Sequence, residues 1–246
     1  MGEKELLEKA PVIVGVLRKL SMRDVERARE SGADMIELRV DLLKDEERRI
    51  EKIKAFLSRL TMPVILTNRK REEGGSFTGT EEERIALLTD ILETGEVRAV
   101  DLEFFLPAAS KAAVVETAKK QQIPVIFSYH DFTGMPGRAE LLKIISSMYE
   151  EGGSVAKIAV TPETFSDALL LLELTYALSR EGKLVATIGM GPVGRHLRVI
   201  APLYGSVLTY GFIEGEEEVV PGQFSVQELK GMLEKLGKAL KNPLLE

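Results

Sequence analysis

Short runs of apolar and β-branched residues recur along the chain, and a segment with helical periodicity follows each run. The eight runs begin near Val12, Met35, Val64, Val97, Pro124, Val155, Leu184 and Val207. Helical periodicity covers residues 81–94, 138–151 and 162–181, and a last helix is expected over Val226–Leu240. Strands that alternate with helices pair in parallel. Eight such units in 246 residues predict an α/β protein, a closed (β/α)8 TIM barrel in a single domain over residues 1–246.

Local signals mark where several of the predicted helices begin and end. Ser21 is placed to cap the first helix, and Thr80 and Glu83 have the spacing of a capping box. Pro162 is expected to open the sixth helix. Glycines suited to a left-handed backbone stand near helix ends, at Gly32, Gly95, Gly152 and Gly182. The alternation of strands and helices therefore continues without an interdomain linker.

Several predicted strands carry charge on one face. In the second strand, Ile36, Leu38, Val40 and Leu42 alternate with Met35, Glu37, Arg39 and Asp41. The outer face of a barrel packs against helices and has to be apolar, so the charged face points into the lumen. The same test turns other polar side chains inward: Thr67, Arg69, Asp101, Glu103, Ser128, His130 and Lys157. They gather near the C-terminal strand ends, where barrel active sites lie; the alternative is a set of ion pairs that only closes the barrel mouth.

Composition removes several classes of function. The chain has no cysteine, which excludes disulfides, thiolate metal sites and a cysteine nucleophile. A net charge of -6 argues against a nucleic-acid partner. The charged start is unlike a signal peptide, and no apolar stretch is long enough to span a membrane, so we expect a cytoplasmic protein. We expect no metal or cofactor, because neither metal-ligand spacing nor a dinucleotide fingerprint is present.

Lys157 lies among small and apolar residues on the sixth strand. Burial favours the neutral amine, which is a nucleophile toward ketones and aldehydes and forms a Schiff base with them. The alternative is a lysine held in an ion pair with Asp101 or Glu103.

His130 is one of two histidines in the chain and lies at the end of the fifth strand. Histidine is the commonest general acid or base at neutral pH. A single histidine is also often structural, but its position beside an inward-facing lysine favours a catalytic role.

Three arginines suggest an anionic substrate. Arg39 and Arg69 lie on inward strand faces, whereas Arg198 lies in a helical segment, where arginine is usually solvated. A guanidinium binds a carboxylate through two hydrogen bonds. Phosphate is the other candidate, but the glutamate run at residues 216–218 would repel it. A carboxylate is therefore favoured.

Six motifs, in order along nearly the whole chain, together resemble the type I 3-dehydroquinate dehydratase family. They are Glu37-Leu38-Arg39-Val40-Asp41, Asn68-Arg69 with Glu73-Gly74-Gly75, Ser128-Tyr129-His130-Asp131-Phe132, Lys157-Ile158-Ala159-Val160, Arg198 upstream of Gly205-Ser206, and Pro221-Gly222-Gln223. The resemblance implies a (β/α)8 barrel that dehydrates 3-dehydroquinate to 3-dehydroshikimate, the third step of the shikimate pathway. It also implies a homodimer.

The resemblance implies a role for each matching residue. Lys157 would form an imine with the C3 ketone of the substrate, and His130 would act as the acid and base. Glu73 would orient and tune this histidine. The substrate-holding positions are Glu37, Arg39, Arg69, Arg198 and Gln223, with Arg198 on the carboxylate.

The segment 212–223 departs from the family pattern. Val219 stands where enteric bacterial members have a serine, and the stretch before Pro221 is slightly longer. The segment follows the eighth strand, where barrel loops reach across the active site, so we expect it to be a mobile lid. The part before Pro11 is also too short for the strand pair that some relatives have.

Two other functions remain open from the residues alone. Another Schiff-base barrel, such as a class I aldolase, would act on a sugar phosphate and need a phosphate loop. A barrel that is not an enzyme would use its lumen charges only as ion pairs. Formation of the 3-dehydroshikimate enone distinguishes these alternatives from a dehydratase.

Overall fold

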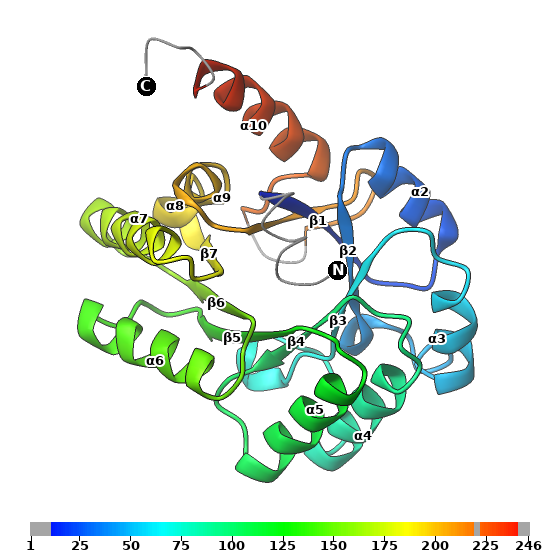
Figure 1. Cartoon of the computed structure of the whole chain (residues 1–246). Helices are drawn as coiled ribbons and strands as arrows, with labels where there is room; N and C mark the ends of the chain where they lie inside the picture. The colour runs from blue at the N-terminus through cyan, green and yellow to red at the C-terminus, as the bar shows by residue number, and fades with distance from the viewer. Residues whose placement is uncertain (1–10, 219–221, 241–246) are drawn as a thin grey trace.

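The computed structural model describes residues 11–218 and 222–240. Eight parallel strands form the inner ring and the helices lie outside it (Figure 1). The strands are β1 (Val12–Leu17), β2 (Met35–Arg39), β3 (Val64–Thr67), β4 (Ala99–Glu103), β5 (Val125–Asp131), β6 (Val155–Val160), β7 (Val185–Gly189) and β8 (Leu208–Phe212). All eight predicted strands are present, each within two residues of its expected start. The predicted (β/α)8 barrel is confirmed.

The strands are paired in sequence order around the ring, with β8 beside β1. The ring is nearly closed between β7 and the residues that lead into β8. There the Val207 amide donates to the Val185 carbonyl at 2.8 Å, and the Thr187 amide donates to Ser206 Oγ at 2.9 Å. The seam at β7 and β8 is therefore held by few hydrogen bonds.

The helices follow the expected alternation. They are α2 (Met22–Glu30), α3 (Ile50–Leu57), α4 (Glu81–Leu92), α5 (Ala108–Lys120), α6 (Arg138–Glu150), α7 (Phe165–Arg180), α8 (Gly191–Gly194), α9 (Leu197–Ile200) and α10 (Val226–Leu240), with short 3-10 helices η1 (Val40–Leu42), η2 (Arg71–Glu73) and η3 (Ala201–Tyr204). Ser21 caps α2, and Thr80 with Glu83 forms the predicted capping box of α4. Backbone φ is positive at the four glycines predicted near helix ends.

Two predicted element boundaries are wrong. Helix α7 begins at Phe165, not at Pro162, because Thr164 and Asp167 form a capping box there. Strand β2 ends at Arg39, and the next residues turn into η1. Asp41 is nevertheless buried, because the turn directs its carboxylate back to Arg39.

The strands separate two apolar layers. Outward side chains such as Ile36, Leu102 and Ile158 belong to the core under the helices. Inward side chains such as Met35, Ile65 and Ile126 form a second cluster in the lumen. The predicted inward and outward faces are therefore confirmed. The lumen cluster fills the barrel below the charged residues, which are left at the C-terminal strand ends.

Some predictions fall on residues that the structure does not describe. The proposed single domain includes 1–10, 219–221 and 241–246, so it stays a prediction for these ranges. The departures noted before Pro11 and at Val219 lie there too. Among the described residues, no helix is both long enough and apolar enough to cross a membrane.

Candidate active site

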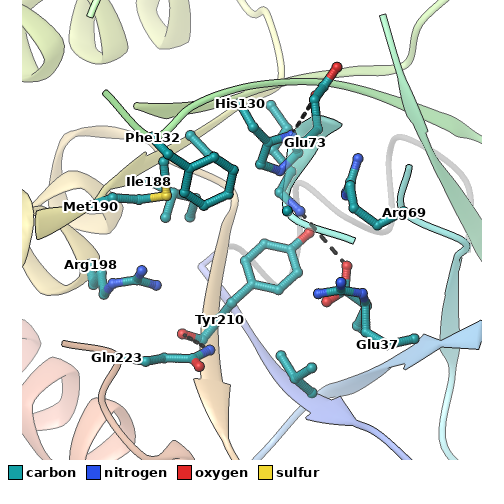
Figure 2. Close-up of a pocket in the computed structure, with 15 residues that line it drawn as sticks. Glu37, Arg69, Glu73, His130, Phe132, Ile188, Met190, Arg198, Tyr210 and Gln223 are labelled. Atoms are coloured by element: carbon teal, nitrogen blue, oxygen red, sulfur yellow. Dashed lines mark hydrogen bonds and ion pairs between the residues drawn. The ribbon is translucent and has the colours of Figure 1, made fainter. Parts of the chain in front are cut away.

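A pocket of about 570 Å³, counting space open to solvent, lies at the C-terminal mouth of the barrel. All eight predicted site residues line it: Glu37, Arg39, Arg69, Glu73, His130, Lys157, Arg198 and Gln223. Figure 2 shows most of these side chains converging from different elements. The same strand alternation that directs them inward also keeps charged side chains out of the layer beneath the helices.

Lys157 extends from the middle of β6 and is 5% exposed. Its Nζ lies 2.7 Å from Asp101 Oδ2 and 3.8 Å from Glu37 Oε1. The Tyr210 ring centroid lies 4.1 Å from Nζ. Lys157 thus both lines the pocket and forms the ion pair that was its alternative role.

Asp101 anchors the charged side of the pocket. Its Oδ1 accepts from Arg69 Nη2 and from Ser128 Oγ, both at 2.6 Å. Burial raises the pKa of this carboxyl, but Arg69 and Lys157 outweigh burial and hold the pKa well below its usual range. Asp101 therefore stays ionised and is a poor base for the Lys157 proton.

Two of the three predicted anion-binding arginines already bind carboxylates of the protein. Arg39 donates to both oxygens of Asp41, at 2.9 and 2.7 Å. Arg69 pairs with Asp101 and lies 3.3 Å from Glu103. Both guanidinium groups line the pocket but are held in place by these pairs. They can orient a substrate, while their charge is already balanced.

Arg198 is the exception. It lies on α9, is 3% exposed and lines the pocket, so it is not on a solvated helix face. Within residues 11–218 and 222–240, no carboxylate forms an ion pair with its guanidinium. Burial outweighs the attraction of Glu218 and lowers the pKa of Arg198 to about 10. A buried cation that lacks a protein partner is a site for an anion from outside.

His130 lies near the end of β5, in register with Ala159 on β6. Its Nδ1 is 2.8 Å from Glu73 Oε2. Burial, with Arg69 and Lys157 nearby, lowers the pKa of His130 well below its usual value. The imidazole is therefore neutral near pH 7. With Glu73 ionised, Nδ1 carries the proton and Nε2 can accept one.

Glu73 is held in the short helix η2, where it also lies 3.2 Å from Lys70 Nζ. Burial raises the pKa of the Glu73 carboxyl, and the positive charge of Arg69 offsets only part of this rise. Gly74 follows with a φ of 79°, and a Cβ there would meet the Phe132 ring. A Cβ on Gly75 would collide with the Arg69 carbonyl. The two glycines therefore let η2 end against Phe132, whose ring stacks with that of His130.

The side formed by β7, α9 and β8 is mostly apolar. Ile188 and Met190 line it, together with Tyr210 from β8 (Figure 2). Gln223 Nε2 is 3.4 Å from the Tyr210 carbonyl, and its side chain is buried.

Tyr210 is a pocket residue that was not predicted from the sequence. The alternation of β8, which makes Leu208 and Tyr210 share a face, was the signal that could have found it.

The predicted lid at 212–223 is not uniformly loose. The Glu214 carbonyl accepts from Arg27 Nη1 at 2.8 Å, and Glu216 pairs with Lys19 at 2.7 Å. These contacts tether its first half to the segment around α2. Residues 219–221 lie outside the described residues, so the lid stays a prediction for the second half.

Comparison with known proteins identifies the family of this chain. The family described as type I 3-dehydroquinase matches residues 12–239. The chain belongs to the type I 3-dehydroquinase family. It is 40% identical to the 3-dehydroquinate dehydratase of Methanosarcina barkeri over 96% of this chain and 98% of that protein. The corresponding Bacillus subtilis protein is 30% identical over 92% and 90%.

Solved structures agree with this membership. The type I 3-dehydroquinate dehydratase of Clostridium difficile, determined with covalent modified comenic acid, has a TM-score of 0.84 and is 29% identical. The match covers 94% of this chain and 93% of that one. The type I 3-dehydroquinases are 3-dehydroquinate dehydratases, which are hydro-lyases. The pocket of this chain therefore has to be considered as the site of a dehydration.

Proposed function

We propose that this chain dehydrates 3-dehydroquinate to 3-dehydroshikimate in the shikimate pathway, through a Schiff base at Lys157. The observation that carries the proposal is the joint presence in one pocket of Lys157, of the neutral His130 held by Glu73, and of Arg198, which has no ion-pair partner in the part of the chain that the structure describes. These groups are the nucleophile, the base and the anion site that the reaction needs. Family membership supplies the substrate.

The first stage joins substrate and enzyme. Lys157 Nζ reacts as the free amine, which has the lone pair that bonds to carbon. Nζ attacks the C3 ketone, and the ketone oxygen takes one proton from the nitrogen and one from solvent. It then leaves as water, and a protonated imine remains. The covalently modified comenic acid in the C. difficile structure supports covalent chemistry in this family.

The second stage eliminates water. The cationic imine withdraws electrons from C2, so the adjacent C–H becomes acidic enough for His130 to take its proton. The electron pair forms the C1–C2 double bond as the C1 hydroxyl leaves on the same face. His130 returns the proton to this hydroxyl, which departs as water. Hydrolysis of the imine then releases the product and restores Lys157.

The substrate carboxylate is placed on Arg198. This guanidinium is buried and lacks a protein carboxylate partner among the described residues, so binding an anion would compensate its desolvation. Glu37, Arg39, Arg69 and Gln223 would contact the ring and its hydroxyls from the surrounding walls.

An absorbance assay combined with borohydride trapping tests the proposal. Added 3-dehydroquinate should produce the enone absorbance of 3-dehydroshikimate. Borohydride should then fix one ligand mass on the peptide that contains Lys157. Peptides that contain surface lysines, such as Lys183, should stay unmodified. Turnover with an unmodified Lys157 peptide would overturn the Schiff base but not the dehydration.

We also propose that the chain is a homodimer, as the family resemblance implies. Phe165, Leu169 and Tyr176 recur along one exposed face of α7. Tyr204 continues this apolar face through its ring contact with Tyr176. Such a surface favours a protein partner, and a second copy is the occupant proposed.

Sedimentation analysis of Leu169→Glu tests the dimer. A charge at this 66% exposed position should produce a monomer, since it would be buried in the interface. Ala112→Glu, at an exposed position on α5, is the control and should remain a dimer. A wild-type chain that sediments as a monomer overturns the proposal.

A further inference from the structure

Tyr210 is a pocket residue to which the mechanism above gives no task. It extends from β8 and is 5% exposed. Its hydroxyl oxygen is buried, with no hydrogen-bond partner among the residues that the structure describes. In Figure 2 the ring crosses the pocket, and its hydroxyl end is directed away from Gln223. A buried hydroxyl left in this state destabilises a protein unless it serves a function.

A partly buried tyrosine elsewhere in this chain shows the usual arrangement. Tyr149 on α6 donates its hydroxyl to the Leu184 carbonyl at 2.8 Å. Tyr210 differs because it lines the pocket and its hydroxyl has no acceptor among the described residues. Its partner is therefore expected to be a bound molecule.

The surroundings keep Tyr210 able to donate a hydrogen bond. Burial raises its pKa well above the usual value, and the negative charges of Glu37 and Asp101 raise it further. The hydroxyl thus keeps its proton throughout the range in which a protein is folded. A protonated hydroxyl can donate to an acceptor, and an oxygen that gains negative charge is the best one.

We propose that the Tyr210 hydroxyl donates a hydrogen bond to the substrate oxygen on the carbon that Lys157 attacks. Lys157 Nζ lies 4.1 Å from the Tyr210 ring centroid, so the attacked carbon has to lie beside this ring. The inference deepens the proposed function and rests on it. Tyr210 would thus act as a catalytic residue for imine formation.

The electron flow explains why a donor is needed there. As the Nζ lone pair forms the C–N bond, the π pair of the C=O bond moves onto the oxygen. The oxygen then takes one proton from the nitrogen and a second from solvent, and it leaves as water. Tyr210 keeps its own proton and stabilises the negative charge between these events. Donors placed for this purpose contribute more in the transition state than in the ground state.

The test isolates imine formation in a His130→Ala background, in which the later proton abstraction is blocked. The double variant His130→Ala/Tyr210→Phe should form the borohydride-trapped adduct about 10- to 100-fold more slowly than His130→Ala. The phenylalanine keeps the ring beside Lys157. Tyr210→Phe alone should have an unchanged or higher Tm, because it removes an unpartnered buried hydroxyl.

Tyr149→Phe is the matched control and should behave in the opposite way. It loses a hydrogen bond, so its Tm should fall while the trapping rate stays unchanged. An unchanged trapping rate in the Tyr210 variant, or a slower rate that accompanies a lower Tm, overturns the proposal. A wild-type chain that neither dehydrates 3-dehydroquinate nor traps it overturns the proposed function as well, which distinguishes the two failures.

Discussion

The two walls of the pocket are built on different principles. On the wall formed by β2 to β6, charged side chains are matched within the protein, as in the pairs Arg39–Asp41 and Lys157–Asp101. On the wall formed by β7, α9 and β8, the Arg198 cation has no carboxylate in an ion pair among the described residues. The Tyr210 hydroxyl there lacks a described partner too. The charges of the first wall have partners without substrate, whereas we expect the groups of the second wall to gain partners when substrate binds.

This difference separates stability from binding. Removing one member of a buried ion pair leaves an uncompensated charge and costs about 3–5 kcal/mol of stability. Removing a buried group that has no partner leaves no other group unpaired, and it also removes the cost of burying that group. Substitutions on the first wall should therefore lower stability as well as activity. Those on the second wall should lower only activity.

Lys157→Met gives the largest expected effect. The apolar chain keeps the packing against Tyr210 but removes the nucleophile, so kcat should fall by at least about 10⁴-fold. No adduct should be trapped by borohydride. Asp101 would keep its pair with Arg69, so the protein should still fold. Residual turnover within about tenfold of the wild type, measured by enone absorbance, would show that Lys157 only pairs with Asp101.

His130→Ala should lower kcat by about 10²–10⁴-fold while the trapped adduct still forms. The base is lost, but the nucleophile and the anion site remain. Mass spectrometry of the borohydride-reduced protein checks the adduct. Near-normal kcat would mean that His130 is structural, held by Glu73 and Phe132 for packing alone.

Much of this first wall could be predicted from the sequence. Strict alternation in β2 and β4 directed Glu37 and Asp101 inward, and the same rule directed Lys157 and His130 there. Parallel strands then place their C-terminal ends at one mouth. Alternation therefore determines which side chains enter the pocket. It does not determine their partners: the ion pair weighed for Lys157 is present, and its role as a nucleophile stays a prediction.

Arg198→Met tests the second wall against the first. The loss of the carboxylate site should raise KM by about 10- to 100-fold, because a charge-assisted pair is worth about 1.5–3 kcal/mol. The melting temperature should stay the same or rise. Arg69→Met, which removes one of the cations that pair with Asp101 and Glu103, should lower it. Calorimetry that shows equal destabilisation in both variants would remove the distinction between the walls.

The second wall was harder to predict for a physical reason. Arg198, Met190 and Gln223 come from loops and a short helix, whose side-chain directions follow no simple period. Arg198 had the pattern of a solvated helical residue but is buried, because α9 is packed between β7 and β8. Tyr210 lies on a regular strand, yet its meaning depends on a missing hydrogen bond, and that can be found only from the fold.

The pH dependence sharpens the account of His130. Its pKa lies below the usual value near 6.5, since burial, Arg69 and Lys157 disfavour the imidazolium. Activity should therefore persist below pH 6.5 and be lost only as pH falls through this lowered pKa. Glu73→Gln removes a carboxylate that favours the imidazolium, so the acid limb of kcat/KM should move to lower pH. Unchanged profiles would exclude a tuning role for Glu73.

The lowered pKa of His130 also makes the stability of the fold depend on pH, and stability, like activity, falls toward low pH. The unfolded chain binds a proton at His130 near pH 6.5, whereas the folded protein resists it. The contribution of His130 to stability is therefore fully present above pH 6.5 and falls as pH decreases toward the folded pKa. In His130→Ala this part of the pH dependence should be absent from the free energy of unfolding.

Gln223→Ala gives the smallest expected effect and tests how far the second wall depends on the segment 212–223. Its amide can donate and accept, which suits substrate hydroxyls, so KM should rise by a few-fold, about 1 kcal/mol for a neutral hydrogen bond. Imine formation at Lys157 should persist.

Hydrogen exchange with and without ligand should show new protection around Gly222 and Gln223. The tethered stretch near Glu214 and Glu216 should change little, since Arg27 and Lys19 already hold it. Equal protection at Gln223 in both states would make this residue a fixed wall of the site, and the ligand would then complete only the contacts at Arg198 and Tyr210.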